Sequence, residues 1–339
     1  MGEREQIGGV TIEKILIFGL GSIGVRHAQV LEGIGKFQMA ACRTKKGLKK
    51  IPQELERTII YFYDEDEALA WSPDFMIVSN STNLHLEYLL KSIDHGIDVL
   101  IEKPMADDYN KVKAVEHRIK KRTNKIYIGF NLRFHPIVRK IKKIIDTREY
   151  GRVLKTNLYV GEYLPFWHPY EDYRKSYAAR KELGGGVLRT LSHEIDLGQY
   201  WFGDYDKIFA RVSKISDLDI DVDDSVDIFA EMKSGEILKL TMDYLNPLRE
   251  RKGELFFEDG LLEYNFSALE IKFTGYSTRE TKTLLKLEDY DNNDQYKCQM
   301  EKFIDRSDEE ICGVEEGINV MKIISKCEES SHTEMVIHV

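Results

Sequence analysis

The sequence predicts an α/β protein in which a doubly wound parallel sheet is followed by a second domain built on a large antiparallel sheet. Three observations predict it. Buried strand-like segments alternate with amphipathic helical segments in the first part of the chain, a glycine-rich motif follows the first of these strands, and period-two segments separated by turn residues appear later. A chain of 339 residues is long enough for two domains. We expect them to comprise residues 1–130 and 131–339.

The first domain begins with a buried strand and a phosphate-binding turn. Residues 15–18 form a continuous apolar run, and Gly19, Gly21 and Gly24 then complete a G-x-G-x-x-G motif that leads into an amphipathic helix. Such glycines allow a tight turn and the close approach of a pyrophosphate to the helix N-terminus. The alternative is a glycine-rich turn without a ligand. We expect a dinucleotide to be held by Gly19, Gly21, Ser22, Ile23 and Gly24.

The end of the second strand carries basic residues where an acid would favour NAD. After Cys42 come Arg43, Thr44 and Lys45, with no Asp or Glu among them. A carboxylate here would bind the adenosine ribose of NAD, whereas an arginine can bind the 2′-phosphate of NADP. We therefore expect NADP(H) to be preferred, with NAD(H) possible. The alternative is that residues 45–50 are simply a solvated loop.

Further strands and helices alternate up to about residue 130, with strands expected in 74–82, 98–104 and 125–133. Ligands bind at the carboxyl ends of such strands. The candidates there for cofactor contacts are Asn80, Thr82, His85, Glu102 and Lys103. His85 alone is better explained by capping or packing than by catalysis. Lys103 follows an apolar strand and precedes a proline, and a lysine there can bind a substrate hydroxyl or lose its proton when desolvated.

The second domain begins with an amphipathic helix over 134–145 and continues with period-two segments in 152–161, 207–216, 225–245, 252–266 and 271–276. They predict an antiparallel sheet with one face available for helices or a partner. Residues 299–331 are helical in pattern. The segment 161–186 is rich in aromatic and basic residues, which suit a sugar ring and an anionic group. Its candidate substrate contacts are Trp167, His168, Tyr173 and Arg180, although aromatic packing of a long loop explains the same composition.

Composition excludes several classes of protein. The net charge of −9 argues against nucleic-acid binding, and no run of about 18 apolar residues predicts a membrane span. The four cysteines lack C-x-x-C spacing, so we expect reduced thiols, no zinc site and a cytoplasmic location. The first residues lack the apolar stretch of a signal peptide.

Four segments carry a resemblance to a known family: "FGLGSIGVRHAQVL", "IEKP", "NLRFHP" and "GGGVLRTLSHEIDLGQYWFG". In this order they resemble the Gfo/Idh/MocA oxidoreductases, the family of glucose–fructose oxidoreductase and inositol dehydrogenase. The resemblance implies an N-terminal Rossmann domain, a C-terminal α/β domain whose large open antiparallel sheet often forms dimers or tetramers, and hydride transfer between NAD(P) and a sugar or cyclitol.

The resemblance also implies roles for individual residues. Lys103 matches the catalytic or substrate-orienting lysine of the family, and His193 matches its histidine. Many members have an aspartate three residues before that histidine, where this chain has Thr190, which cannot change charge at neutral pH. We therefore assign the general acid/base role to His193, assisted by Lys103. Arg133, Thr190 and His193 complete the expected substrate contacts.

Two further expectations concern the neighbours of His193. The glycines at 184–186 are expected to let the chain pass close to nicotinamide or substrate. Glu194 and Asp196 are expected to cap or pack and not to bind a metal, since only His193 and Asp196 share a helix face.

The leading hypothesis is a sugar dehydrogenase or reductase whose substrate is bulky or anionic, such as a nucleotide-linked sugar or a sugar acid of surface-polysaccharide pathways. A second hypothesis is a non-catalytic dinucleotide-binding sensor or partner protein, which Thr190 favours. A third is a lyase or hydrolase that uses tightly held NAD⁺. We expect no nucleic-acid or membrane partner, and a homodimer or homotetramer through the open sheet.

Overall fold

The computed structural model describes residues 6–7, 10–35, 37–44, 51–167 and 171–339, and it divides into two compact units. The first unit comprises Met1–Ala106, Asn110–Asn131 and Asn292–Gly317. The second comprises Asp107–Tyr109, Leu132–Asp291 and Ile318–Val339. The chain passes from the first unit into the long middle segment of the second after Asn131. Residues 292–317, which the sequence analysis placed in the second domain, lie in the first unit.

The first unit contains the predicted parallel sheet. Its seven strands lie in the order β17-β8-β7-β6-β3-β4-β5, and all neighbours are parallel except β17, which is antiparallel to β8. The chain therefore reverses its direction of winding between β3 and β6, which is where dinucleotides bind in folds of this kind. The strands are β3 (Glu13–Phe18), β4 (Phe37–Cys42), β5 (Ile59–Phe62), β6 (Phe75–Val78), β7 (Asp98–Ile101), β8 (Ile126–Ile128) and β17 (Cys312–Gly313), with β1 (Gln6–Ile7) and β2 (Val10–Thr11) as a separate pair.

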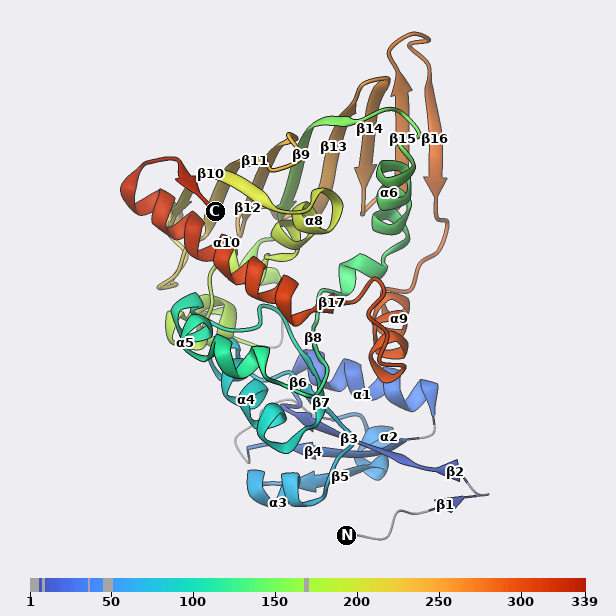
Figure 1. Cartoon of the computed structure of the whole chain (residues 1–339), viewed down its shortest axis with the longest axis vertical. Coiled ribbons are helices and arrows are strands. Elements are labelled where there is room, and N and C mark those ends of the chain that lie inside the picture. Colours follow the sequence, from blue (N-terminus) through green and yellow to red (C-terminus); the bar gives the residue numbers. More distant parts are fainter. Residues whose placement is uncertain (1–5, 8–9, 36, 45–50, 168–170) are drawn as a thin grey trace. The chain divides into compact units, whose positions relative to one another are not determined.

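Helices connect these strands, as the alternating pattern predicts (Figure 1). β6 reads Phe-Met-Ile-Val and is buried along its whole length, as expected for a strand covered on both faces. α4 ends at Gly96, whose left-handed φ of 64° lets its N–H reach the carbonyls of the last turn. The helices of this unit are α1 (Ser22–Ile34), α2 (Gln53–Thr58), α3 (Glu65–Ala70), η1 (Thr82–Leu84), α4 (His85–His95), α5 (Tyr109–Lys120) and α9 (Asn293–Ile304), and η2 (Asn131–Phe134) begins at the last residue of this unit before the chain continues into the second.

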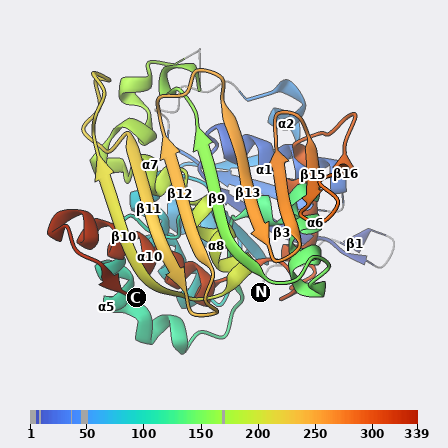
Figure 2. The ribbon, with the colours of Figure 1, turned by 90° about the horizontal axis from the view of Figure 1, so that it is seen from above.

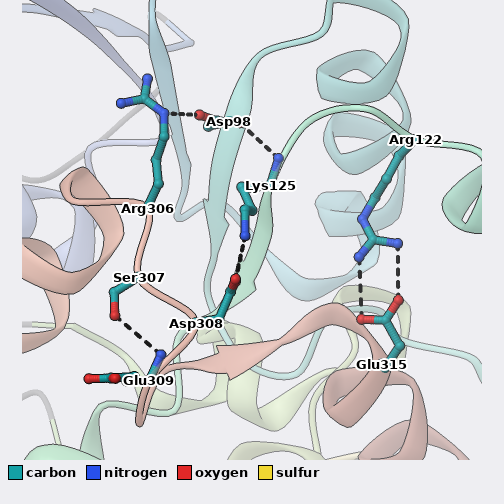
Figure 3. A network of polar contacts seen from close by, with 8 residues as sticks. All are labelled: Asp98, Arg122, Lys125, Arg306, Ser307, Asp308, Glu309 and Glu315. Atoms are coloured by element: carbon teal, nitrogen blue, oxygen red, sulfur yellow. Dashed lines mark hydrogen bonds and ion pairs between the residues drawn. The ribbon is translucent and has the colours of Figure 1, made fainter.

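The returning segment 292–317 completes the core of the first unit. Phe303 of α9 is fully buried, with its ring edge-on to Phe75 at 5.2 Å and to Tyr127 at 5.9 Å between ring centroids. At the surface, Arg306 binds Asp98, Lys125 binds Asp308, and Arg122 binds Glu315 (Figure 3). Exposed ion pairs stabilise by at most about 1 kcal/mol each. The buried aromatic contact is therefore the larger reason why this segment belongs to the first unit.

The second unit is built on a nine-stranded sheet in the order β16-β15-β14-β13-β9-β12-β11-β10-β18. Its neighbours are antiparallel except β9 and β12, which run parallel. The alternation seen in the sequence is real: β11 buries Val226, Ile228, Ala230 and Met232 and directs the residues between them outward. The strands are β9 (Val153–Gly161), β10 (Tyr205–Ser213), β11 (Ser225–Met232), β12 (Ile237–Asp243), β13 (Glu250–Phe257), β14 (Gly260–Asn265), β15 (Glu270–Gly275), β16 (Thr281–Lys286) and β18 (Ile337–His338).

Helices of the second unit cover one face of this sheet, and Figure 2 shows the strands from the opposite face. On that face Phe209 and Phe229 are directly opposite each other on β10 and β11, with 46% and 52% of their surface exposed. The helices are α6 (Pro136–Thr147), η3 (Leu164–Phe166), η4 (Tyr173–Lys175), η5 (Tyr177–Ala179), η6 (Lys181–Leu183), α7 (Val187–Thr190), α8 (His193–Phe202) and α10 (Val314–Thr333). Within the described residues, no helix is long and apolar enough to cross a membrane.

Candidate functional site

The three glycines of the turn between β3 and α1 have two different roles. A Cβ on Gly19, whose φ is 90°, would lie 2.8 Å from the backbone nitrogen of Asn80, and a Cβ on Gly24 would lie 2.0 Å from the carbonyl oxygen of Gly19. A Cβ on Gly21 would meet no described atom within 4 Å. The first and third glycines are therefore required by packing, whereas the second keeps open the space beside the helix N-terminus.

That open space fits the pyrophosphate of a dinucleotide. α1 begins at Ser22, no side chain caps its N-terminus, and its first turn contains no acid that would repel an anion. The positive end of a helix beside an unobstructed glycine is a phosphate-binding arrangement. Ser22 is exposed and Ile23 is half-buried at the same turn. The structure thus brings together all five residues predicted from the motif.

The end of β4 presents the residues expected at the adenosine ribose. Arg43 is half-buried and its backbone N–H donates to the carbonyl of Phe62 at 3.1 Å, while Thr44 is exposed. Burial, with Glu65 and Asp64 nearby, raises the pKa of the Cys42 thiol to about 11, so this thiol is protonated at neutral pH. Lys45 lies outside the described residues.

The loop after β7 carries Lys103 beside a buried carboxylate. Glu102 Oε1 lies 2.7 Å from Nε2 of His27, and Glu102 Oε2 accepts the backbone N–H of Lys103 at 3.3 Å. Burial alone would raise the pKa of Glu102, but the hydrogen bond from His27 and the nearby Lys103 lower it below the ordinary value. Glu102 is therefore an ionised acceptor at neutral pH. His27, on α1, was not singled out from the sequence; its position three residues after Gly24 was the available signal.

His85 holds the other side of the same loop. Its Nδ1 lies 2.7 Å from the carbonyl oxygen of Pro104, and its Nε2 lies 3.1 Å from the carbonyl oxygen of Asn80. Burial lowers the pKa of His85, so the ring is neutral at pH 7. Asn80 Oδ1 is buried without a hydrogen-bond partner among the described residues. Thr82 is buried at the start of η1. A direct cofactor contact of these residues stays a prediction.

In the second unit, the glycines at 185 and 186 make room for the chain itself. A Cβ on Gly185 would lie 2.4 Å from the carbonyl oxygen of Tyr177. A Cβ on Gly186, whose φ is 103°, would lie 2.2 Å from Oδ1 of Asp223. The Oδ2 atom of Asp223 accepts the N–H of Leu188 at 2.8 Å, at the start of α7. The sequence analysis explained these glycines by close approach of nicotinamide or substrate, whereas the observed close approach is to Asp223 and the backbone at Tyr177.

Thr190 forms a buried hydroxyl pair. Its Oγ1 donates to the carbonyl of Gly186 at 2.7 Å and is hydrogen-bonded to the hydroxyl of Tyr244. Burial raises the pKa of Tyr244 well above its ordinary value, so neither hydroxyl carries a charge at neutral pH. His193, also buried, is the first residue of α8. Sequence reasoning missed Tyr244; its place at the end of a period-two segment was the only signal.

The acids that follow His193 are both bound by arginines. Arg133 Nε and Nη2 contact Asp196 Oδ2 at 3.0 Å and Oδ1 at 2.6 Å, and both side chains are almost fully buried. Glu194 Oε1 accepts from Arg251 Nε at 2.7 Å. Both acids therefore pack, as the sequence analysis expected. Arg133 has a structural function in this pair, and its contact with substrate stays a prediction. In the part of the chain that the structure describes, no cluster of three His, Cys, Asp or Glu residues could hold a metal ion.

The aromatic segment, residues 161–186, contains Trp167, which contacts Tyr244, the hydrogen-bond partner of Thr190. The ring of Trp167 is edge-on to the ring of Tyr244 at 5.3 Å, and its buried Nε1–H has no partner among the described residues. Tyr173 instead accepts the backbone N–H of Asp219 through its hydroxyl at 3.3 Å. Arg180 is half-buried, with Nη1 3.8 Å from Oδ2 of Asp221. His168 lies outside the described residues.

Several known proteins are similar in sequence to parts of the chain. Levoglucosan dehydrogenase of Pseudarthrobacter phenanthrenivorans is 29% identical over 42% of this chain and 36% of its own length. Myo-inositol 2-dehydrogenase of Thermotoga maritima is 25% identical over 66% of each. A putative oxidoreductase of Bacillus subtilis, YteT, is 30% identical over 39% of this chain and 30% of its own length. The chain thus matches less than half the length of the first and third of these relatives.

The fold is shared over nearly the whole chain. A structure of levoglucosan dehydrogenase in complex with NADH has a TM-score of 0.85 and 17% identity, covering 96% of this chain and 99% of that one. A putative NADPH-dependent oxidoreductase of Desulfitobacterium hafniense has a TM-score of 0.83 and 16% identity, covering 96% and 97%.

Family models match both units. Residues 13–130 match the model described as "Oxidoreductase family, NAD-binding Rossmann fold", and residues 138–263 match the model described as "GFO/IDH/MocA C-terminal domain". Together the two matches cover more than half of the chain. The protein is therefore a member of the Gfo/Idh/MocA family of oxidoreductases, and its first unit is the family's nicotinamide-dinucleotide-binding domain.

Proposed function

We propose that the protein is a dehydrogenase or reductase that transfers a hydride between NAD(P) and a hydroxyl or carbonyl carbon of a sugar derivative. The observation that carries the proposal is the open side of Gly21 at an uncapped helix N-terminus, in the unit that also contains Lys103. When bound, the nicotinamide accepts a hydride from the carbon of a secondary alcohol, or returns one to a carbonyl. The relatives named as sugar and cyclitol dehydrogenases support this reaction class.

We assign the transfer of the hydroxyl proton to His193 and the stabilisation of negative charge on the substrate oxygen to Lys103. In the oxidation direction, the imidazole of His193 takes the hydroxyl proton while the carbon loses its hydride and becomes a carbonyl carbon. The role we propose for the ammonium of Lys103 is to bind a substrate oxygen and to stabilise the negative charge that develops on it. Thr190 would bind substrate as an uncharged hydroxyl. Its hydrogen bond to Tyr244 supports a positional role, because neither group can take up the proton at neutral pH.

We also propose that NADP(H) is the preferred cofactor, because Arg43 can bind a 2′-phosphate and no acid follows β4. The test is a parallel fluorescence titration of the protein with NADPH and NADH. Arg43→Leu should raise the Kd for NADPH about tenfold or more, a loss of about 1.4 kcal/mol, and leave the Kd for NADH unchanged. Arg57→Leu, an exposed site on α2, is the matched control. Tighter binding of NADH by the unmodified protein would refute the preference and keep the dehydrogenase proposal.

The substrate class we propose is a bulky or anionic sugar, such as a nucleotide-linked sugar or a sugar acid used in surface-polysaccharide biosynthesis. Half-buried Trp167 and Arg180 support it, because an indole face suits a sugar ring and a guanidinium suits a carboxylate or phosphate. A screen of sugar acids, nucleotide sugars and neutral sugars with NADP⁺ tests this class. His193→Ala should lower kcat by about 10²- to 10⁴-fold. Bound cofactor with no turnover of any sugar would favour the sensor hypothesis instead.

The open face of the nine-stranded sheet is our proposed contact between copies of the chain. Phe209 and Phe229 support it, because two large apolar side chains lie exposed side by side on that face. Gel filtration should show a dimer or tetramer, and Phe229→Lys should shift the elution toward the monomer. Elution of the unmodified protein as a monomer of 39.4 kDa would refute this contact.

A further inference from the structure

The loop that carries Lys103 is held on both sides by buried histidines of the first unit. His27, from α1, reaches Glu102, the residue before Lys103. His85, from α4, reaches the carbonyl of Pro104, the residue after it. Both imidazoles are almost completely shielded from solvent, with 0% and 1% of their surface exposed. Because His27 is fully buried, any effect of its ring on the chemistry would pass through the loop.

The contact with His27 fixes the carboxylate of Glu102 in one orientation. Since Glu102 is ionised, its oxygens only accept, so His27 Nε2 carries the hydrogen that lies between the two groups. The second carboxylate oxygen is thereby directed at the backbone N–H of Lys103. A Cβ on Gly129 would lie 3.1 Å from both carboxylate oxygens, so neighbouring backbone also packs tightly against this group. A charged, buried hydrogen bond of this kind is among the stronger ones in proteins.

The contact with His85 fixes the backbone on the other side of Lys103. Both ring nitrogens face carbonyl oxygens, and a neutral imidazole has only one N–H. The shorter contact, 2.7 Å from Nδ1 to the oxygen of Pro104, therefore takes that hydrogen. His85 begins α4, directly after the turn at the end of β6, where Asn80 packs against Gly19. The two histidines thus connect the Lys103 loop to the helices that follow β3 and β6.

We propose that His27 is a positioning residue for Lys103, acting through the Glu102 carboxylate, with His85 as its counterpart on the opposite side of the loop. This rests on the proposed function of Lys103. His27 lies on the helix whose N-terminus we assign to the pyrophosphate. The same rigid element therefore places both the cofactor phosphates and the loop that carries the ammonium group. A side chain that only fills the core would not need a charged hydrogen bond to the neighbour of Lys103.

The first measurement is backbone hydrogen exchange of the peptide that contains Lys103, which needs no substrate. His27→Leu removes the donor and should speed exchange in that peptide about tenfold or more, with the other peptides of β7 and β8 unchanged. His27→Gln, which keeps an N–H donor, should restore most of the protection. His117→Leu, at an exposed site on α5, is the control. Unchanged exchange in His27→Leu would overturn the proposal, whatever the protein's activity.

The second measurement is a double-mutant cycle on kcat. His27→Leu should lower kcat about tenfold or more and change the Kd for the cofactor less than twofold. In a Lys103→Ala background the same change should have no further effect, because the lysine through which His27 acts is gone. An equal loss of kcat in both backgrounds would mean a general structural role and would overturn the proposal.

A third variant covers the case in which His27→Leu does not fold. Glu102→Gln keeps the size of the side chain but replaces one accepting oxygen by an NH₂ group, which only donates and therefore cannot accept from the N–H that faces it. It should reproduce the faster exchange and the loss of kcat. If exchange responds as expected but no sugar is turned over, the proposed function fails and the positioning of the loop stands. If sugars are turned over but exchange and coupling are absent, the reverse holds.

Discussion

Serine in place of Gly21 should separate cofactor binding from folding. The backbone of Gly21 is extended, with φ −73° and ψ −161°, and a Cβ there would meet no described atom within 4 Å. The residue is also the N-cap of α1, where serine is preferred over glycine by a few tenths of a kcal/mol. Gly21→Ser should therefore leave the free energy of unfolding unchanged or slightly higher. Its side chain occupies the space that we assign to the pyrophosphate, so the Kd for NADPH should rise about tenfold or more, or about 1.4 kcal/mol.

The same substitution at Gly24 provides the contrast. A Cβ there would lie 2.0 Å from Gly19 O and 2.7 Å from Ser79 Oγ, so the β3–α1 turn must move. Overpacking of this kind costs about 1–3 kcal/mol of folding stability. Gly33, on the exposed side of the same helix, has no described atom within 4 Å of its Cβ position. Gly33→Ala should stabilise by about 0.5–1 kcal/mol and leave binding unchanged.

The assay combines urea unfolding with a fluorescence titration of NADPH on the three variants. The reasoning requires weaker binding with intact stability in Gly21→Ser and lowered stability in Gly24→Ser. Wild-type affinity in Gly21→Ser would refute the placement of the pyrophosphate. A large loss of stability in that variant would show that the space beside Gly21 is needed by the chain itself.

Three further predictions concern stability. Burial lowers the pKa of His135 to about 4. Between pH 6.5 and pH 4 the His135 imidazole is therefore protonated in the unfolded chain but neutral in the folded chain. The stabilisation is complete above the ordinary histidine pKa, and about 3 kcal/mol of it is lost as the pH falls to about 4. Urea unfolding at pH 7 and pH 4.5 should show this loss in the wild-type protein and not in His135→Asn; equal pH dependence in both would contradict it. Asp196→Ala leaves the buried guanidinium of Arg133 without its carboxylate and should cost about 3–5 kcal/mol, whereas replacing both residues by leucine and methionine should recover most of it in the same unfolding assay. Phe303→Ala should destabilise the first unit by about 3–5 kcal/mol, seen as faster hydrogen exchange in β6 and β8; exchange changes confined to the second unit would count against its assignment to the first.

The features that could be predicted from the sequence are those whose pattern lies within a single segment of the chain. The apolar run before Gly19 is a strand buried on both faces, and the alternation in β11 is a strand with one buried face. The spacing of the glycines indicates a strand–turn–helix unit, and the local contact within it is that of Gly24, where a Cβ would meet the carbonyl oxygen of Gly19. Short, right-handed crossovers between parallel strands restrict such units to a few doubly wound orders, and the first sheet has one of them. Fold class and the dinucleotide turn followed from the sequence for that reason.

Other features depend on partners that are remote in the sequence. Helical periodicity in residues 292–317 indicates a helix but not which sheet it covers, and the burial of Phe303 against Phe75 decided that in favour of the first unit. β17 has only two residues, too few for any pattern, and is a strand solely because β8 lies beside it.

The candidate site divides in the same way. The local pattern predicted a lysine, Lys103, just after a buried strand and a histidine, His193, at the start of a helix, and the structure has both in these places. The sequence could not predict which residues form hydrogen bonds with each other, namely Glu102 with His27, Asp196 with Arg133 and Thr190 with Tyr244. Whether a polar side chain binds a ligand or another part of the chain depends on which buried donor lies within about 3 Å of it. Only the tertiary structure sets that distance, because the residues of each pair are 54 to 75 positions apart along the chain.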